Sequence, residues 1–402
     1  MDMTNPPETQ TDRHDSGWFA PSGLFSEGEI LRNHAIHAAD GRIDAVAAIA
    51  DLPQTTRPRP LAGILAPGAV DLQVNGGGGI LFNTSPTRAG LGQMVDAHRR
   101  LGTARILATV ISDTEAATEA AVAAVCDNWG LPGLAGIHIE GPHISPVKRG
   151  THSAAVLRPL SDHTLGLIRR LREMDIPTMI TLAPEVVPPA QIRTLADLGA
   201  VVSLGHSNAS FAQACGALAA GASCFTHLFN AMSPFGSREP GMVGAALAGD
   251  AAVGFICDGH HVSDDTLKIA LSVSGATDRF FLVSDAMPTV GGPEAFALYG
   301  QPIRVSDGRL INAEGALAGA HVWMTAAMTR ARNVLGLPTE TVLRMAITRP
   351  AALMGLRDAA ALRGRPLGDL VVWDEDLRSC SALTDILAFD QDGQVRSAAT
   401  TG

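Results

Sequence analysis

Aromatic residues are scarce in this sequence, at 4% of its 402 residues, and Tyr299 is the only tyrosine. A surface that binds ligands by stacking them on aromatic rings is therefore not expected. Positive charge is also in deficit, because 30 lysines and arginines face 40 aspartates and glutamates, for a net charge of -10. That balance argues against an extended groove that neutralises the phosphates of a nucleic acid, so we expect no nucleic-acid partner.

The sequence also lacks a disulfide framework, a secretion signal and a membrane span. Its five cysteines are odd in number and none belongs to a CxxC motif, which is typical of a protein kept in a reducing compartment. The first residues are polar and acidic, without the basic start and apolar run of a signal peptide. No apolar run approaches the about 18 residues that a membrane helix requires. We therefore expect a soluble, cytoplasmic protein with no membrane partner.

What the chain does have is an alternation of short apolar runs and amphipathic stretches. The apolar runs predict eight strands, at Gly63–Val74, Ala104–Ile111, Leu134–Ile139, Thr178–Leu182, Val201–Leu204, Cys224–Leu228, Val253–Cys257 and Phe280–Val283. Helices are predicted at Arg88–Leu101, Glu115–Asn128, Ser161–Met174, Pro189–Leu198, Ser210–Ala219, Asp264–Val273, Trp323–Val334 and Thr339–Thr348. Apolar strands separated by helices indicate parallel strands covered on both faces. The fold class is therefore α/β, with a (β/α)8 barrel favoured and an open doubly wound sheet as the alternative.

The two ends of the chain differ from this pattern. Residues 1–20 are polar and proline-rich and are predicted to form a flexible arm. Short apolar runs broken by turns in 21–62 and again in 357–402 predict a small β domain formed by both ends of the chain. The barrel is expected to occupy residues 63–356.

Polar, chemically capable side chains follow the predicted strands where each one ends. They are Gln73, Asn75, Glu140, Glu185, His206, His227, His261 and Asp285. In a barrel, the carboxyl ends of the strands meet on one face, and active sites are built there. We expect these side chains to share one pocket.

Glu140, His206 and His227 form the most informative group among them. One carboxylate and two imidazoles make an open zinc shell, and iron or another divalent ion would accept the same set. A single histidine at a strand end is more often a hydrogen-bonded polar residue than a ligand, but three such residues on one face favour a metal. Asp285 would then accept a proton from a water activated by the metal; the alternative is a helix N-cap.

Two residues suggest an anion site near this pocket. Arg238 lies in a loop after the sixth strand, and His261 follows the seventh. A guanidinium matches phosphate geometry well, although a surface pair between Arg238 and Glu239 is the alternative. The glycine run at 76–79 matches no phosphate-binding pattern and predicts a tight turn.

Several motifs occur in one order along the chain. They are Pro67–Gly79, Gly136–Pro142, Lys148–His152, Leu204–Ser207, Thr226–Met232, Arg238–Gly241, Asp258–His261 and Val283–Ala286. Together they resemble the N-acetylglucosamine-6-phosphate deacetylases of the amidohydrolase superfamily. The resemblance implies a (β/α)8 barrel with a β-sandwich built from both termini, a homodimer, and hydrolysis of N-acetylglucosamine-6-phosphate to glucosamine-6-phosphate and acetate.

The resemblance also implies a role for individual residues. Glu140, His206 and His227 would hold the metal, Asp285 would be general base and acid, and His152 would polarise the acetamide carbonyl. The sugar phosphate would be bound by Thr151, Asn230, Ala231, Arg238, His261 and the turn Leu317, Ala318 and Gly319. Arg238 would reach the phosphate across the dimer interface.

One departure from the superfamily concerns the first strand. Most members carry an HxH motif there that binds a second metal, whereas this chain has Gln73 and Asn75. Neutral amides are poor ligands for zinc or iron, so we expect one divalent ion per subunit, with zinc preferred.

The sequence alone leaves alternatives to this function open. The same scaffold could act on N-acetylgalactosamine-6-phosphate, because no residue identifies the epimer. A cyclic amidase is disfavoured, since no lysine lies at a strand end to bridge two metals. A catalytically silent scaffold is the alternative from another class, and it would not need Glu140, His206, His227 and Asp285 together.

Overall fold

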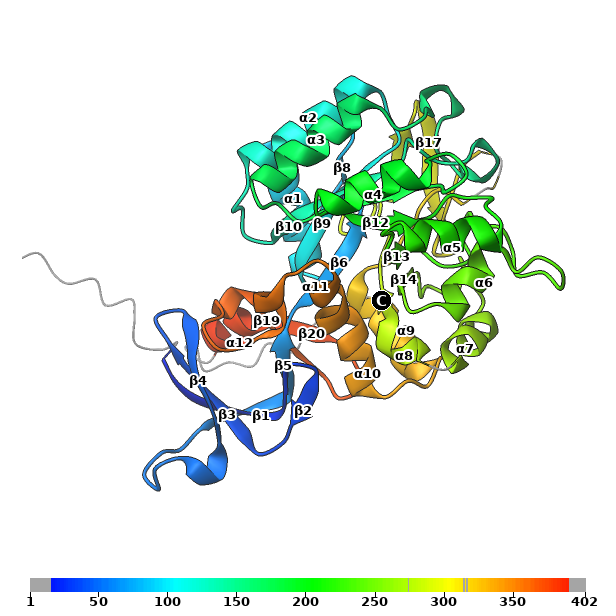
Figure 1. The fold of residues 1–402 in the computed structure, drawn as a ribbon. Helices are drawn as coiled ribbons and strands as arrows, with labels where there is room; N and C mark the ends of the chain where they lie inside the picture. Colours follow the sequence, from blue (N-terminus) through cyan, green and yellow to red (C-terminus); the bar gives the residue numbers. More distant parts are fainter. Residues whose placement is uncertain (1–15, 274, 314, 316, 390–402) are drawn as a thin grey trace, which may run out of the picture.

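The computed structural model describes residues 16–273, 275–313, 315 and 317–389, so most of the arm predicted for residues 1–20 lies outside the described residues. Two parts are visible in Figure 1: a barrel with its covering helices, and a sheet at lower left that combines blue strands from the start of the chain with red ones from its end. Within the described residues, no helix is long and apolar enough to cross a membrane.

The barrel consists of eight parallel strands in the order β15-β14-β13-β12-β11-β10-β9-β6. The strands are β6 (Ala69–Val74), β9 (Thr103–Ile111), β10 (Leu134–Glu140), β11 (Thr178–Leu182), β12 (Val201–Leu204), β13 (Cys224–Phe225), β14 (Ala252–Phe255) and β15 (Phe280–Leu282). The seam between the last and first strands is closed by the backbone N–H groups of Asn75 and Gly76, which donate to the carbonyl of Ala286 at 2.9 and 3.0 Å. The predicted (β/α)8 barrel is confirmed, and the open sheet is excluded.

Helices cover the outside of the barrel (Figure 1). They are α1 (Arg88–Arg99), α2 (Glu115–Asp127), α3 (Asp162–Glu173), α4 (Pro189–Asp197), α5 (Phe211–Ala219), α6 (Gly241–Ala248), α7 (Asp264–Ser272), α8 (Ala276–Arg279), α9 (Met324–Asn333), α10 (Thr339–Leu343) and α11 (Arg349–Leu353), with a π-helix at Arg344–Thr348. Short 3-10 helices lie at Ile49–Asp51, Pro146–Lys148, Ala154–Val156, Arg357–Ala360 and Leu367–Asp369. Helix α6 escaped prediction because its sequence, GMVGAALA, has no polar face, and its residues 241–246 are all buried.

The terminal sheet contains seven strands in the order β20-β19-β5-β1-β3-β4, with β2 paired to β1. Its strands are β1 (Gly17–Ser26), β2 (Glu29–Leu31), β3 (His34–Ala39), β4 (Arg42–Ala48), β5 (Arg59–Pro67), β19 (Leu370–Trp373) and β20 (Cys380–Ala382), followed by α12 (Leu383–Phe389). Strand β5 lies between β1, which runs parallel to it, and β19, which runs antiparallel. A β domain built from both ends of the chain is therefore present, with its own buried cluster that includes Phe19, Leu65 and Leu370.

Two boundaries differ from the sequence-based ones. The strand predicted at Gly63–Val74 is two strands, because the chain leaves the terminal sheet at Pro67 and enters the barrel at Ala69. Gly68 makes this step against Ala104, where a Cβ on the glycine would lie 2.7 Å from that of the alanine. The terminal sheet thus continues to Pro67 rather than to residue 62, and it begins at Gly17, inside the predicted arm.

A three-stranded antiparallel sheet follows the barrel strands, formed by β16 (Ala295–Leu298), β17 (Gln301–Ser306) and β18 (Arg309–Ile311). Asp307 and Gly308 form the turn between β17 and β18. The sheet packs through Leu298, Ile303 and Leu310 against Ile111 at the end of β9. A small hairpin of β7 (Gly76–Gly77) and β8 (Ile80–Leu81) forms the tight turn expected at the glycine run.

Candidate active site

A cavity of about 180 Å³ opens at the carboxyl ends of the barrel strands. It is lined by Asn75, Ile111, Glu140, Gly150, Thr151, His152, His206, His227, Asn230, Ala231, His261, Asp285, Leu317 and Gly319. Most of the side chains predicted for the site are therefore brought together. Ala318 is fully buried behind the lining, and Arg238 is exposed in its loop and does not line the cavity.

Local backbone geometry aims the key side chains into this cavity. His206, His227 and Asp285 follow the ends of β12, β13 and β15 with positive φ angles of 46°, 27° and 53°. Residues other than glycine rarely adopt this conformation, and where they do the surrounding structure must hold them in place. Glu140 is instead the last residue of β10 and points inward from a regular strand position.

Glu140, His206 and His227 form a tight buried cluster. Nε2 of His227 lies 3.2 Å from Oε1 of Glu140, and Nε2 of His206 lies 3.3 Å from the same oxygen. The two Nε2 atoms are 3.1 Å apart. Nδ1 of His206 is 3.0 Å from the carbonyl of Lys148, so it carries a proton and leaves a lone pair on Nε2. This donor set suits a divalent metal ion.

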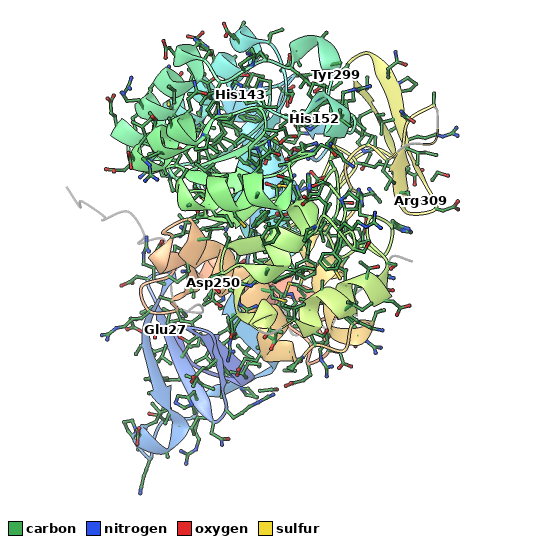
Figure 2. The ribbon with its side chains drawn as sticks, turned by 45° about the vertical axis from the view of Figure 1, so that its right-hand side comes forward. Glu27, His143, His152, Asp250, Tyr299 and Arg309 are labelled. Atoms are coloured by element: carbon green, nitrogen blue, oxygen red, sulfur yellow. The ribbon has the colours of Figure 1, made fainter. Side chains whose placement is uncertain are left out.

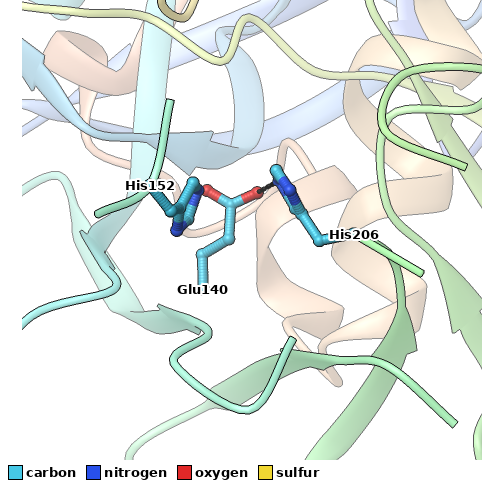
Figure 3. A group of neighbouring side chains, drawn as sticks. All are labelled: Glu140, His152 and His206. Atoms are coloured by element: carbon cyan, nitrogen blue, oxygen red, sulfur yellow. Dashed lines mark ion pairs between the residues drawn. The ribbon is translucent and has the colours of Figure 1, made fainter. Parts of the chain in front are cut away.

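His152 lies beside this cluster, on the other side of Glu140 (Figure 3). Its ring centroid is 4.5 Å from that of His206. Potential ligand atoms of Glu140, His152 and His206 also lie within 4.8 Å of one another. Two sets of three ligands are therefore available, which share Glu140 and His206 and differ in the third residue.

Gln73 and Asn75 contact the two carboxylates of the site. Nε2 of Gln73 donates to Oε1 of Glu140 at 2.8 Å and to Oδ1 of Asp285 at 3.1 Å. Nδ2 of Asn75 donates to the same oxygen of Asp285 at 2.7 Å. The sequence showed only that these amides replace metal-binding histidines; their role as donors was missed. The sequence does place two amides and two acids at strand ends, and this pattern could have indicated hydrogen bonds between them.

The buried charges shift the pKa values of the site. Burial, with the nearby charge of Glu140 as the second cause, raises the pKa of Asp285 to about 6. Burial also acts to raise the pKa of Glu140, but the adjacent imidazoles of His206 and His227 outweigh it and hold that pKa well below its ordinary range. Burial and the proximity of His206 lower the pKa of His152 to about 3, so that its ring is neutral. A carboxyl group with a pKa near 6 is suited to accept and return a proton near neutral pH.

The alternatives considered for single residues can now be compared with the structure. Asp285 caps no helix, because the next described helix begins at Met324. Glu239 accepts from the backbone N–H groups of Phe211 and Gly241, and no ion pair joins it to Arg238 among the described residues. His261 is held by Asp258, whose Oδ2 lies 2.7 Å from Nδ1 of the ring.

Comparison with known proteins supports the family resemblance found in the sequence motifs. No family model matches the sequence. The chain is 38% identical over 362 residues to an N-acetylgalactosamine-6-phosphate deacetylase of Shewanella sp. (strain ANA-3), which covers 88% of this chain and 91% of the relative. It is 31% identical to an N-acetylglucosamine-6-phosphate deacetylase of Haemophilus influenzae, which covers 83% and 89%. The crystal structure of N-acetylglucosamine-6-phosphate deacetylase from Pasteurella multocida superposes with a TM-score of 0.82 at 30% identity, covering 91% of this chain and 98% of that one.

The barrel and the polar cluster at its strand ends define a hydrolase of the amidohydrolase superfamily. Within that superfamily, the chain belongs to the family of N-acetylglucosamine-6-phosphate and N-acetylgalactosamine-6-phosphate deacetylases. The resemblance seen in the sequence motifs is thereby confirmed.

Proposed function

We propose that the protein hydrolyses the N-acetyl group of N-acetylglucosamine-6-phosphate to glucosamine-6-phosphate and acetate, in amino-sugar breakdown and recycling. The observation that carries this proposal is the convergence of Glu140, His206, His227 and Asp285 on one cavity in a member of this family. All five cysteines are free thiols, in keeping with a cytoplasmic location.

One divalent ion per subunit, preferably zinc, would be held by Glu140, His206 and His227. Their ligand atoms are 3.1 to 3.3 Å apart, and each can offer a lone pair to the same ion. When bound, the ion supplies Lewis-acid chemistry at the acetamide carbonyl and lowers the pKa of water in the site. The amides of Gln73 and Asn75 offer no comparable ligand for a second zinc ion.

The side chains around the cluster carry the proton transfers. Asp285 accepts a proton from the attacking water, and its Oδ1 is fixed for this by Gln73 and Asn75. His152, neutral at the cavity wall, donates a hydrogen bond to the carbonyl oxygen as negative charge develops there. Asp285 then returns the proton to the leaving nitrogen, so that the amine departs neutral and acetate remains.

We assign the remaining predicted residues to the sugar phosphate. Thr151, Asn230, Ala231, His261, Leu317 and Gly319 line the cavity, and Ala318 sets the turn behind it. Arg238 is exposed, and the neighbouring Phe235 is 67% exposed on the same loop. We infer a homodimer in which Arg238 of the partner subunit meets the phosphate. Arg238→Ala should raise KM for the phosphorylated sugar and leave KM for the unphosphorylated one unchanged, and sedimentation should give a dimer.

N-acetylgalactosamine-6-phosphate is the second candidate substrate, favoured by the 38% identity to the Shewanella enzyme. The deciding experiment measures amine release from both epimers and from unphosphorylated N-acetylglucosamine, before and after chelation and with metal added back. We expect chelator-sensitive turnover with the highest kcat/KM for the phosphorylated gluco epimer. A higher kcat/KM for the galacto epimer would assign the second function. No turnover of either sugar phosphate in the presence of metal would contradict both and indicate a silent scaffold.

A further inference from the structure

Ser112, the residue that follows β9, contacts two residues of the site and also Tyr299, and it is only 1% exposed. Its hydroxyl oxygen lies 2.6 Å from Nδ1 of His152, and its backbone N–H donates to the same nitrogen at 3.3 Å. The hydroxyl is also 3.4 Å from the backbone carbonyl of Glu140. The carbonyl of Ser112 accepts a hydrogen bond from the hydroxyl of Tyr299 at 2.5 Å.

The backbone contact indicates which nitrogen of His152 carries the proton, and the hydroxyl can then donate to the same nitrogen. A backbone N–H can only donate, so Nδ1 must present its lone pair to Ser112. A neutral imidazole then has its single proton on Nε2. Among the described residues, Nε2 of His152 has no hydrogen-bond partner, and His152 lines the cavity. The ring is thus arranged to offer an N–H group to a bound molecule.

We propose that Ser112 is a positioning residue that holds His152 in the Nε2–H tautomer, as a donor to the substrate carbonyl and not as a ligand of the metal. The role at the carbonyl rests on the proposed function; the tautomer does not. A nitrogen that carries a proton has no lone pair for a metal ion. Of the two possible ligand sets, the tautomer therefore selects Glu140, His206 and His227 over Glu140, His152 and His206.

Two neighbours keep Ser112 in this orientation. Gly141 leaves room for the hydroxyl, since a Cβ on that glycine would lie 2.2 Å from Oγ of Ser112. On the other side, Tyr299 stands at the turn between β16 and β17 and fixes the backbone of Ser112, and Figure 2 shows Tyr299 and His152 at the same end of the barrel. The sheet of β16 to β18 is thereby connected to His152 through one residue, Ser112.

The first test compares Ser112→Ala with a matched control. Thr164→Ala removes a buried hydroxyl that lies 3.0 Å from Nε2 of another buried histidine, His143, which does not line the cavity. Ser112→Ala should lower kcat about 10- to 100-fold, as loss of an orienting partner does, with metal content unchanged. Thr164→Ala should leave kcat unchanged. Equal loss in both variants, or wild-type kcat in Ser112→Ala, would overturn the role of Ser112.

The second test reads the tautomer directly and needs no turnover. Nitrogen-15 NMR of histidine-labelled, metal-free protein reports the protonated nitrogen of each ring, with the His152 signals assigned by their loss in His152→Asn. We expect the Nε2–H pattern in the wild type and its survival after zinc is added. In Ser112→Ala we expect a mixture of tautomers, because the hydroxyl at 2.6 Å is lost and only the longer backbone N–H contact at 3.3 Å remains at Nδ1. An Nδ1–H pattern, or loss of the Nε2 proton on zinc addition, would refute the proposal. If the sugar phosphates were not hydrolysed but this pattern were present, only the proposed function would fail.

Discussion

The two sides of the cavity stabilise their buried polar groups in different ways. On the side of β10, β12 and β13, an oxygen of Glu140 and the Nε2 atoms of His206 and His227 crowd within 3.3 Å of one another. On the side of β6 and β15, Asp285 accepts hydrogen bonds from Gln73 and Asn75. The first side gathers potential metal-ligand atoms, whereas on the second side two amide donors converge on one carboxylate oxygen, Oδ1 of Asp285.

This difference explains why the two sides would have different tasks. Converging lone pairs repel one another unless a cation lies between them, so the first side gains stability from a metal. On the second side, the amides of Gln73 and Asn75 hold Oδ1 of Asp285 in a fixed orientation, and burial raises the pKa of this carboxyl group to about 6. Under the proposed function, such a site would bind a cation on one side and exchange protons on the other.

The largest effect should follow from removing one of the proposed metal ligands on the side of β10, β12 and β13. We expect His227→Ala to lose the metal and to reduce activity below detection, because loss of a ligand costs more than the about 10- to 100-fold typical of an outer partner. Metal analysis of the purified variant is the measurement. His98→Gln is the control, since His98 is a buried histidine bound to the carbonyl of Gly76 outside the cavity. Full metal occupancy in His227→Ala would make His152 the third ligand.

Asp285→Asn tests the proton-exchanging side with little change in shape. The variant should lose about 10²- to 10⁴-fold in kcat, the range for general acid–base catalysis, and should still bind one equivalent of metal. Steady-state kinetics and metal analysis on the same preparation give both values. Retention of most of the wild-type kcat would remove Asp285 from the mechanism.

Gln73 connects the two sides, because its amide donates to both Glu140 and Asp285. Gln73→Leu should weaken metal affinity and lower kcat by about 10- to 100-fold each, as outer partners of metal ligands do. Competition with a chelator measures the affinity. A change in kcat with unaltered affinity would show that Gln73 serves the side of Asp285 alone.

The smallest effect concerns Asp71 on β6, a fully buried carboxylate whose Oδ1 accepts from the N–H groups of Gln73 and Ser284 at 3.2 Å. Its Oδ2 has no partner among the described residues, and burial raises its pKa to about 7. Between about pH 4 and 7 the folded protein therefore holds a proton that the unfolded chain releases, so the free energy of unfolding falls as pH rises. Asp71→Asn should remove this dependence. Urea unfolding of metal-free protein at pH 5 and 8 should show a difference of roughly 3 kcal/mol in the pH response of the two proteins.

The strongly patterned parts of the fold were predictable from the sequence. Strands β11 and β12 begin and end where their apolar runs do, because polar or glycine residues bound each run. Helix α6 and the sheet of β16 to β18 were missed, since the first has no polar face and the second has short, mostly exposed strands.

The same contrast holds for the candidate site. Glu140, His206, His227 and Asp285 could be found because each ends a recognisable strand on one barrel face. Ser112 and Tyr299 could not, because a single serine after an apolar strand and a tyrosine in a turn give no periodic signal. Their importance comes from contacts across 40 and 187 residues of sequence, which only the folded chain brings together.

The arrangement of the terminal sheet has a consequence for synthesis of the chain. Strand β5 pairs with β19, yet about 300 residues separate Pro67 from its partner Leu370. At about 5 to 20 residues per second, a ribosome takes on the order of 15 to 60 s to make that interval. During this time the barrel can form while one hydrogen-bonding edge of β5 stays unpaired and open to aggregation. The strands made last therefore cover an edge of β5 that stays exposed while the residues between β5 and β19 are synthesised.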